Sequence, residues 1–551
     1  MRDIRPFLPM RPPVRIWEAN HSLTWTRIVG ISSMMHSPGA RTAVTLCTAL
    51  FLPRFVHAVP SSCGALSNLL LPDTSITLAQ SVPAGEFTLP EGLRPDQLTA
   101  PGVRPAAGVL KKLPSFCRVS ATLKPTPDSD IKVEIWMPQA NWNGKYEAVG
   151  NGGWAGSITY ANMAEALLNG YATSGTDSGH TGGSGSFALG HPEKLIDFAW
   201  RSEHEMTIKA KAVIKAFYGD DPRFSYWVGC SSGGKQGLKE AQNFPDDYDG
   251  IVAGAPVLNW THRSIEALWV ALAVLKDAAS YIPPEKYPVI HQAAVAACDE
   301  SDGLKDSLIG DPEGCRFDPG TLECKEGDSP QCLTHPQVEA ARKIYSPALN
   351  PRTGEQLSPR FEPGSELGWR AIAGGPAPFS AANDYFKYVV FRNPNWDWRT
   401  FDLDGDATLA DRIDNGTINA TSADLKRYAV HGGKLILYHG WTDTNITPAA
   451  TVEYFKKVIA QTGGGADAAQ SVRLFMVPGM NHCGGGEGPN VFSMTSALER
   501  WVEEGKAPDQ ILASHLTSGK IDRTRPLCSY PKIAHYKGMG DPNDAANFVC
   551  K

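Results

Sequence analysis

The sequence lacks a strong excess of charge of either sign. It contains 52 lysine and arginine residues and 58 aspartate and glutamate residues among 551, which gives a formal net charge of −6. The two signs are intermixed along the chain, so there is no basic field to hold a phosphate backbone. We therefore expect no nucleic acid partner. Internal repeats and low-complexity tracts are also lacking, which excludes a repeat architecture.

The sequence shows no apolar run that predicts a permanent membrane helix. Its first apolar stretch, residues 42–52, is too short to cross a bilayer, and we expect no membrane partner. Arg41 precedes this stretch and Val-His-Ala, ending at Ala58, follows it, which is the layout of a signal peptide. Residues 1–58 are therefore expected to be a signal peptide with an N-terminal extension, because a start at Met34 or Met35 would give the signal an ordinary length. The mature protein would be secreted or periplasmic.

The cysteine count favours the same compartment. Of 11 cysteines, Cys47 lies inside the expected signal, so the mature chain would keep an even number. An even number in an exported protein indicates disulfides. The alternative is a cytosolic enzyme with buried free thiols, which would need no signal peptide.

Hydrophobic patterning predicts an α/β fold with a largely parallel sheet. Residues 131–137 alternate apolar and polar side chains, and we expect them to pair with the strand at 145–149 as its neighbour. Further along, strand, turn, helix and strand follow one another, which is typical of parallel sheets. The other expected strands are 224–228, 250–255, 434–438 and 472–477, and the expected helices are 201–217, 235–242 and 449–460.

A long segment interrupts this alternation. Residues 257–426 are rich in proline, glycine and tryptophan and contain four cysteines. We interpret them as an inserted lid domain. The catalytic domain would then comprise residues 59–256 and 427–551.

A candidate nucleophile lies where a strand is expected to end and a helix to begin. Residues 229–233 read Gly-Cys-Ser-Ser-Gly, which matches the G-x-S-x-G pattern of a nucleophile elbow. The glycines allow a tight turn that presents Ser231 near the positive end of the following helix. The alternative is a glycine turn with no chemical role.

A serine hydroxyl needs a base, and the base needs a carboxylate. His482 follows the last expected strand and Asp443 follows the strand before it, which gives the order Ser, Asp, His of α/β-hydrolases. His482 could instead be a surface histidine. Asp443 could cap the helix that begins near residue 447, and Asp177 is the competing carboxylate.

The tetrahedral intermediate of ester hydrolysis requires preorganised N–H donors. The backbone N–H of Ser232, the residue after the nucleophile, can supply one. The glycine-rich loop after residue 149 is the best source of a second, and Gly153 would let its backbone approach closely.

These motifs together resemble the tannase and feruloyl esterase family. The resemblance rests on Cys230 beside Ser231, on Asp443 in His-Gly-Trp-Thr-Asp, and on Cys483 beside His482, and it extends from about residue 63 to 550. It implies an α/β-hydrolase fold and a serine esterase. It also implies five disulfides: Cys230–Cys483, Cys63–Cys117, Cys298–Cys315, Cys324–Cys332 and Cys528–Cys550.

The family resemblance also implies a structural calcium ion. Residues 298–315 form a carboxylate-rich loop whose spacing differs from that of an EF-hand. The expected ligands are Asp299, Asp302 and Asp306 with the backbone oxygens of Leu304 and Leu308. Composition alone leaves a solvated acidic loop as an equal alternative.

The expected substrate is an ester of a small aromatic acid. Some aromatic side chains of the lid could form an acyl pocket, although most are expected to be ordinary core, and Ile446 would face that pocket. Feruloyl esterase is the leading hypothesis, with tannase and mono(2-hydroxyethyl) terephthalate hydrolase as alternatives. A non-catalytic secreted binding protein and a peptidase are the hypotheses from other classes. The oligomeric state is not predicted.

Overall fold

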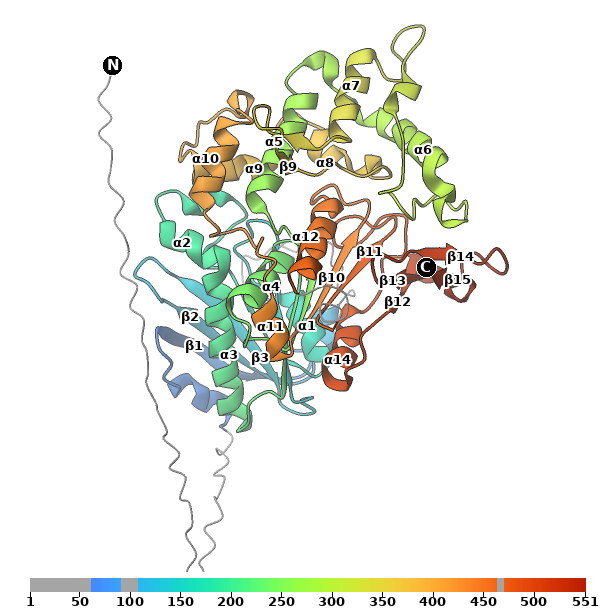
Figure 1. Ribbon diagram of the computed structural model, residues 1–551. Coiled ribbons are helices and arrows are strands. Elements are labelled where there is room, and N and C mark those ends of the chain that lie inside the picture. The colour runs from blue at the N-terminus through green and yellow to red at the C-terminus, as the bar shows by residue number, and fades with distance from the viewer. Residues whose placement is uncertain (1–60, 91–107, 463–469) are drawn as a thin grey trace, which may run out of the picture. The chain divides into compact units, whose positions relative to one another are not determined.

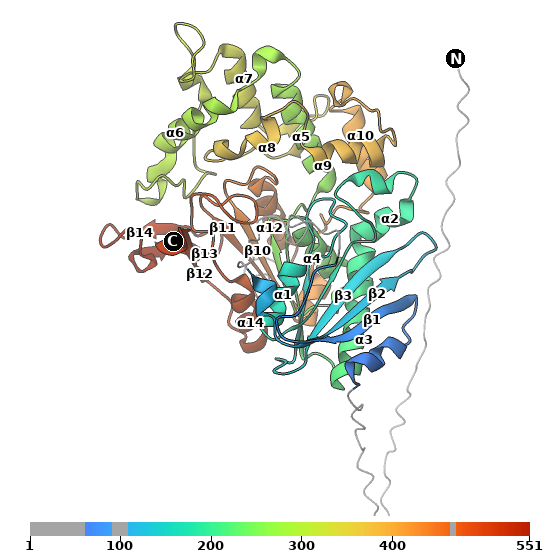
Figure 2. The same cartoon turned by 180° about the vertical axis from the view of Figure 1, so that it is seen from behind.

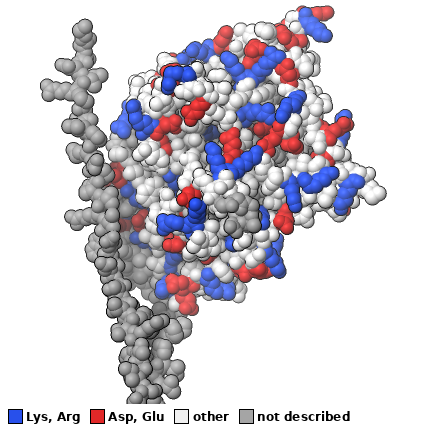
Figure 3. Space-filling model, viewed as in Figure 1, with Lys and Arg blue, Asp and Glu red and all other residues white. Residues whose placement is uncertain are grey.

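The computed structural model of the protein describes residues 61–90, 108–462 and 470–551. The expected signal peptide, residues 1–58, lies outside the described residues. Among the described residues, no helix is both long and apolar enough to span a membrane. On the face seen in Figure 3, acidic and basic side chains alternate, and neither sign gathers into a patch.

A nine-stranded sheet forms the centre of the protein (Figure 1). Strands β1 to β3 and β5 pair in antiparallel fashion, and the strands from β5 through β4 to β11 pair in parallel. The order across the sheet is β1-β2-β3-β5-β4-β6-β7-β10-β11. The strands are β1 (Thr74–Val82), β2 (Phe116–Leu123), β3 (Ile131–Pro138), β4 (Lys145–Val149), β5 (Ala172–Thr176), β6 (Phe224–Cys230), β7 (Gly250–Gly254), β10 (Lys434–Gly440) and β11 (Val472–Val477).

One strand prediction is wrong. β3 and β4 are not neighbours, because β5 lies between them and pairs antiparallel with β3 and parallel with β4. Helix α1 (Tyr160–Leu168) connects β4 to β5 and returns the chain to this central position. The β5 sequence, Ala-Thr-Ser-Gly-Thr, has no large apolar residue, yet every residue in it is buried. Its small side chains left no hydrophobic signal to find.

Helices cover both faces of the sheet. On one face lie α3 (Ser202–Tyr218), α4 (Ser232–Asn243), α11 (Lys426–His431) and α12 (Pro448–Gln461). On the other face α1 is joined by α14 (Met494–Glu504). The amphipathic pattern that predicted a helix over 201–217 corresponds to α3, whose buried residues include Met206, Ala210 and Val213, and Gly219 ends it in the left-handed region.

Residues 257–425, all of them described, contribute no strand to the large sheet. They form helices that gather beyond one end of the parallel strands, as Figures 1 and 2 show from opposite sides. Helices α5 and α9 reach back to the cavity beside Ser231. The helices are α5 (Trp260–Val274), α6 (Tyr287–Cys298), α7 (His335–Ile344), α8 (Arg370–Ala373), α9 (Ser380–Asp384) and α10 (Gly405–Asp414), with a short ribbon of β8 (Ala348–Leu349) and β9 (Gln356–Ser358).

The remaining elements are small. Helix α2 (Pro192–Ile196) precedes α3. Two antiparallel ribbons end the chain, β12 (Gln510–Thr517) with β13 (Lys520–Cys528) and β14 (Ala534–Tyr536) with β15 (Phe548–Cys550).

Candidate active site

The turn between β6 and α4 holds Ser231 in an unusual backbone conformation. Its φ of 64° and ψ of −123° lie where L-residues are rare. A Cβ on Gly229 would lie 2.4 Å from the carbonyl oxygen of Gly233, and one on Gly234 would lie 2.5 Å from that of Gly254. Both distances are too short for real contacts, so the turn requires glycine at both positions. It has the form of a nucleophile elbow.

Ser231 lines a cavity of about 110 Å³ that His482 also lines. A larger cavity of about 550 Å³ lies beside the C-terminal ribbons, but it contains neither Ser231, Asp443 nor His482. We therefore identify the candidate site by the cavity that Ser231 lines, although this cavity is the smaller of the two. Within the described residues no hydrogen bond joins Ser231 Oγ to the imidazole, so proton transfer requires a small approach of the two side chains.

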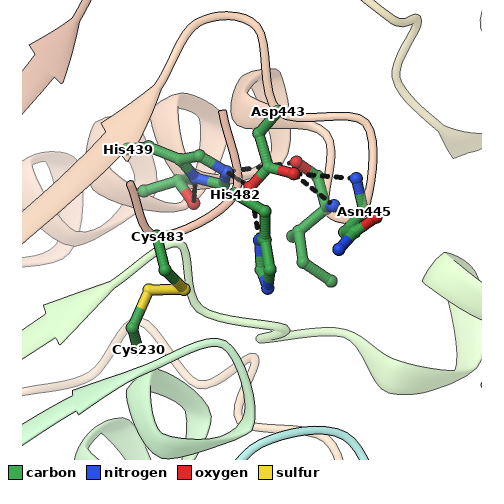
Figure 4. The surroundings of a disulfide bond; sticks show 8 residues. Cys230, His439, Asp443, Asn445, His482 and Cys483 are labelled. Atoms are coloured by element: carbon green, nitrogen blue, oxygen red, sulfur yellow. Dashed lines mark hydrogen bonds and ion pairs between the residues drawn. A yellow bond between two sulfur atoms is a disulfide. The ribbon is translucent and has the colours of Figure 1, made fainter. Parts of the chain in front are cut away.

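Asp443 and His482 are in direct contact. Asp443 Oδ2 lies 2.7 Å from His482 Nδ1 (Figure 4). The two residues follow β10 and β11, which are parallel neighbours, so their loops leave the sheet at the same edge. Because a carboxylate only accepts, Nδ1 carries the proton and Nε2 is left to take one from a hydroxyl. The side chain of His482 is only 10% exposed, which argues against a surface histidine.

The competing carboxylate, Asp177, makes different contacts. Its Oδ1 accepts hydrogen bonds from the backbone N–H groups of Lys132 and Gly179, both at 2.9 Å. Burial raises the pKa of Asp177 to about 7, against the lowering effect of these two hydrogen bonds. Asp177 therefore holds the loop after β5 and is not in position to orient His482.

Asp443 also organises its own loop. Its Oδ1 accepts hydrogen bonds from the backbone N–H groups of Asn445 at 2.8 Å and Ile446 at 3.0 Å. The residue that caps α12 is Thr447, so Asp443 does not serve as the helix cap. One oxygen of Asp443 fixes the loop and the other faces His482.

A second histidine contacts Asp443, and sequence reasoning missed it. His439, buried at the end of β10, places Nε2 3.0 Å from Asp443 Oδ2 and 3.1 Å from the carbonyl oxygen of Ile446. Both are acceptors, so Nε2 carries a proton, while Nδ1 faces the hydroxyl of Thr451 at 2.8 Å. The available signal was its position four residues before Asp443 in a strand that otherwise reads as apolar.

These contacts keep Asp443 ionised. Burial alone would raise the pKa of Asp443, but the charge of His482 and the hydrogen bonds from both histidines hold it well below its usual range. The carboxylate accepts four hydrogen bonds, two from imidazoles and two from backbone amides. An ionised, fully hydrogen-bonded carboxylate is what a triad needs to stabilise an imidazolium.

A disulfide joins the two halves of the site. Cys230, immediately before Ser231, is bonded to Cys483, immediately after His482, with their Cα atoms 6.0 Å apart (Figure 4). The two cysteines are 253 positions apart in the sequence. The bond therefore ties the elbow to the histidine loop by a covalent link of two side chains. The other four pairs implied by the family resemblance are also formed: Cys63–Cys117, Cys298–Cys315, Cys324–Cys332 and Cys528–Cys550.

The expected oxyanion donors lie together. Ser232 Oγ donates to the carbonyl oxygen of Gly153 at 3.0 Å, and both residues line the cavity. Neither backbone N–H donates to another described residue, so both remain available. The loop of Gly153 is anchored by Asn151, whose carbonyl accepts from Gly233 N at 2.8 Å and whose N–H donates to Gln236 Oε1 at 3.0 Å.

The walls of the cavity are mostly apolar. Ile446, expected to face an acyl pocket, lines it together with Trp260 of α5 and Phe379 before α9. Most other aromatic side chains of residues 257–425 are core. Trp369, Tyr385 and Phe386, for example, are fully buried.

One charged residue in the cavity wall was not predicted. Arg263 of α5 donates from Nε to the carbonyl oxygen of Asn445, and its guanidinium lies 4.9 Å from the ring centroid of Phe379. Burial lowers the pKa of Arg263 and raises that of its neighbour Glu266 to about 7. Arg263 therefore supports the Asp443 loop from the side of α5. A lone arginine in a helix gave no sequence signal for this role.

The acidic loop has the donors expected for calcium. Burial raises the pKa of Asp302 to about 6, against the lowering effect of the hydrogen bond from the Leu304 N–H, and the charges of Asp306 and Asp299 also raise it. The carbonyl oxygens of Leu304 and Leu308 accept no hydrogen bond from the described residues. Carboxylate and carbonyl oxygens form the ligand set that Ca²⁺ prefers, so the residues fit the ion.

Arg525 of β13 contacts the same loop. Its Nη2 lies 2.5 Å from Asp306 Oδ2. Among the described residues, only one group of three His, Cys, Asp or Glu side chains has its ligand atoms all within 4.8 Å of one another, and that group does not include Asp299, Asp302 or Asp306. Calcium binding therefore requires the three aspartates to draw closer together and Asp306 to be shared with Arg525.

Comparison with known proteins gives consistent matches. The family model described as tannase and feruloyl esterase matches residues 117–551. An uncharacterized esterase of Xanthomonas campestris is 36% identical and covers 94% of this chain and 96% of its own length. A probable feruloyl esterase B-2 of Neosartorya fischeri is 33% identical, covering 90% and 96%. The crystal structure of feruloyl esterase B from Aspergillus oryzae superimposes with a TM-score of 0.81 at 32% identity, over 89% of this chain and 99% of that one.

Proposed function

The chain belongs to the tannase and feruloyl esterase family, and we propose that Ser231, His482 and Asp443 are its catalytic triad. It is a carboxylic ester hydrolase of the feruloyl esterase type with an α/β-hydrolase fold. The observation that carries the residue assignment is the cavity that Ser231 and His482 line together, with Asp443 hydrogen-bonded behind the histidine.

In the proposed mechanism, Ser231 Oγ attacks the ester carbonyl carbon while His482 Nε2 takes the hydroxyl proton. Asp443 holds the imidazole and stabilises its positive charge. The N–H groups of Ser232 and Gly153 donate to the oxyanion, and the fact that neither has an acceptor among the described residues supports this role. The intermediate then collapses, and His482 returns the proton to the departing alcohol. Water repeats the sequence on the acyl-enzyme and releases the acid.

The acyl group would lie against Ile446, Trp260 and Phe379. These side chains suit a flat, apolar ring, and the cavity of about 110 Å³ favours a small acid over a long-chain one. A relative of this chain is named a probable feruloyl esterase, so esters of ferulic acid are the leading substrate hypothesis. Tannase and mono(2-hydroxyethyl) terephthalate hydrolase activities are the alternatives. Residues 257–426 would act as a lid, because α5 and α9 supply part of the cavity wall.

Two further parts of the proposal concern the protein around the site. The loop of Asp299, Asp302 and Asp306, with the carbonyls of Leu304 and Leu308, would bind a structural Ca²⁺. The ion would neutralise a buried carboxylate cluster and would supply no chemistry to the ester. The protein would be exported, since five disulfides persist in an oxidising compartment.

The test is hydrolysis of methyl ferulate, methyl gallate and mono(2-hydroxyethyl) terephthalate by the purified protein and by its Ser231→Ala variant. We expect methyl ferulate to be turned over with the highest kcat/KM and the variant to lose that turnover. Ser67→Ala is the control, because Ser67 is exposed and does not line the cavity. Full activity in Ser231→Ala would refute the triad, and a higher kcat/KM on either other ester would replace the substrate assignment. A serine-directed phosphonate distinguishes an inactive binding protein, which would not be labelled.

A further inference from the structure

Three side chains from three elements converge on the face of the sheet covered by α3 and α4. His204 comes from α3, Glu240 from α4, and Asp247 from the loop before β7. One nitrogen or oxygen atom of each lies within 4.8 Å of the other two. None of the three lines the cavity of Ser231.

Glu240 is the unusual member of this cluster. It is 1% exposed, and neither of its carboxylate oxygens has a hydrogen-bond partner in the described part of the chain. A buried carboxylate without a partner is strongly disfavoured. Among the described residues, no lysine, arginine or histidine donates a hydrogen bond to this side chain.

Lys211 of α3 does not supply a positive charge to Glu240 by direct contact. Lys211 Nζ donates to the backbone carbonyl of Asp247 and lies 5.7 Å from the ring centroid of Tyr248. Because this hydrogen bond goes to a backbone carbonyl, it does not engage the carboxylate oxygens of Asp247 or Glu240.

His204 is held in a fixed orientation toward the same point. Its ring stacks on Phe244, with 3.7 Å between centroids and 8° between planes, and its Nδ1 lies 2.7 Å from Asp247 Oδ2. The side chains of His204 and Asp247 are 24% and 13% exposed, so the cluster can be reached from solvent. The cluster combines the buried carboxyl group of Glu240 with a partly exposed imidazole and carboxylate.

We propose that His204, Glu240 and Asp247 bind a divalent transition-metal ion of the zinc class. One imidazole nitrogen and two carboxylate oxygens suit such an ion better than Ca²⁺, which prefers oxygen alone. Bonds of about 2.0–2.2 Å require ligand atoms no more than about 4 Å apart, so the side chains would move by less than about 1 Å. The ion replaces the proton on His204 Nδ1, and water completes its coordination.

Such an ion would connect three elements behind the nucleophile. Glu240 follows Ser231 by nine positions in the sequence, which corresponds to about 13 Å along α4. The metal would therefore fix the far end of α4 against α3 and the loop before β7 without touching the ester. This inference does not depend on the proposed substrate or triad.

The experiment measures zinc binding to the full-length protein. Wild type is stripped with EDTA, dialysed against saturating CaCl₂ to fill the acidic loop, and titrated with ZnCl₂, and bound zinc is counted by plasma mass spectrometry. Glu240→Gln and His204→Gln are expected to bind one equivalent less than wild type. His515→Gln is the matched control, because His515 Nδ1 also lies 2.7 Å from a carboxylate, that of Asp522, but the pair lies outside the three-residue cluster.

A loss of one equivalent in both cluster variants, with no loss in His515→Gln, supports the site. A crystal soaked in ZnCl₂ should then show an anomalous peak between the three side chains. Equal zinc in wild type and His204→Gln, or no zinc bound by wild type, overturns the proposal. Because His204 is partly exposed, its variant remains informative even if Glu240→Gln fails to fold.

Discussion

His439 Nε2 lies 3.0 Å from Asp443 Oδ2, the oxygen that also accepts the hydrogen bond from His482. Two imidazoles from different strand ends therefore share one carboxylate oxygen. His439 does not line the cavity, so it is a positioning residue that acts through Asp443.

The first prediction concerns His439→Gln. The substitution removes a hydrogen bond to a buried charged group, and such bonds contribute roughly 1.5–3 kcal/mol. We expect kcat to fall by about 10-fold to 100-fold while KM stays within about twofold, because the cavity walls are unchanged. Steady-state kinetics on methyl ferulate measure both parameters.

A double-mutant cycle separates positioning from simple destabilisation. In an Asp443→Asn background, His439→Gln should cost little further activity, since its effect passes through the Asp443 carboxylate. Equal losses in the two backgrounds would contradict the assignment.

The second prediction concerns the Cys230–Cys483 bond. Replacing both cysteines with serine should lower the free energy of unfolding by about 2–5 kcal/mol, because the bond closes a very long loop in the unfolded chain. It should also lower kcat, since the elbow and the histidine loop lose their link. Chemical denaturation and kinetics at 25 °C give the two values.

The matched control is the Cys324–Cys332 pair, which are only 8 positions apart and do not line the cavity. Its double serine variant should lose less stability and keep kcat. A kcat loss as large as that of the first variant would show that the tether has no special role in catalysis.

The third prediction concerns calcium. EGTA should lower the melting temperature of wild type by several degrees, and Asp302→Asn should show the lower temperature with or without EGTA. Activity of both proteins at 25 °C should stay close to that of untreated wild type, because the loop does not contribute to the cavity. If the melting temperature of wild type changes with neither EGTA nor added CaCl₂, the protein does not bind a stabilising calcium ion.

The fourth prediction concerns pH and Glu147 of β4. Burial, with the charges of Glu499 and Glu165, raises the pKa of Glu147 from 4.5 to about 8. Below about pH 4.5 the folded and unfolded chains both hold the proton. As pH rises the unfolded chain loses it first, so this carboxyl lowers the free energy of unfolding progressively up to about pH 8.

Glu147→Gln should therefore raise the free energy of unfolding at pH 8 by about 4 kcal/mol and leave it nearly unchanged at pH 4.5. Denaturant titrations at the two pH values measure the difference. Glu86→Gln, at an exposed position, is the control and should show no such pH dependence. A Glu147→Gln effect of equal size at both pH values would rule out the titration as its cause.

Local patterns predicted the sheet well where a strand has its own signal. Apolar residues identified β6, β7, β10 and β11, and the glycine-rich turn identified Ser231. β5 was missed because its buried residues are small and polar, and its place between β3 and β4 depends on the crossover through α1. Position in a sheet is a property of pairing, which hydrophobic patterning does not encode.

Contacts between distant residues were the hardest to predict. His439 is the first residue of the motif His-Gly-Trp-Thr-Asp, but the sequence does not show that its side chain turns toward Asp443. That orientation depends on Thr451 and on the carbonyl of Ile446. Arg263 acts through a loop about 180 positions away in the sequence. The disulfide pairs came from the family resemblance, because spacing alone allows many connectivities.

The bond between Cys230 and Cys483 closes the intervening chain into a covalent ring, and the whole of residues 257–425 lies within that ring. A protease that cuts once anywhere in that segment leaves Ser231 and His482 in a single covalently connected molecule. Reduction is required before the two fragments can separate. The region above the cavity can thus be nicked, or rebuilt from two fragments, while the nucleophile and the base stay tethered to each other.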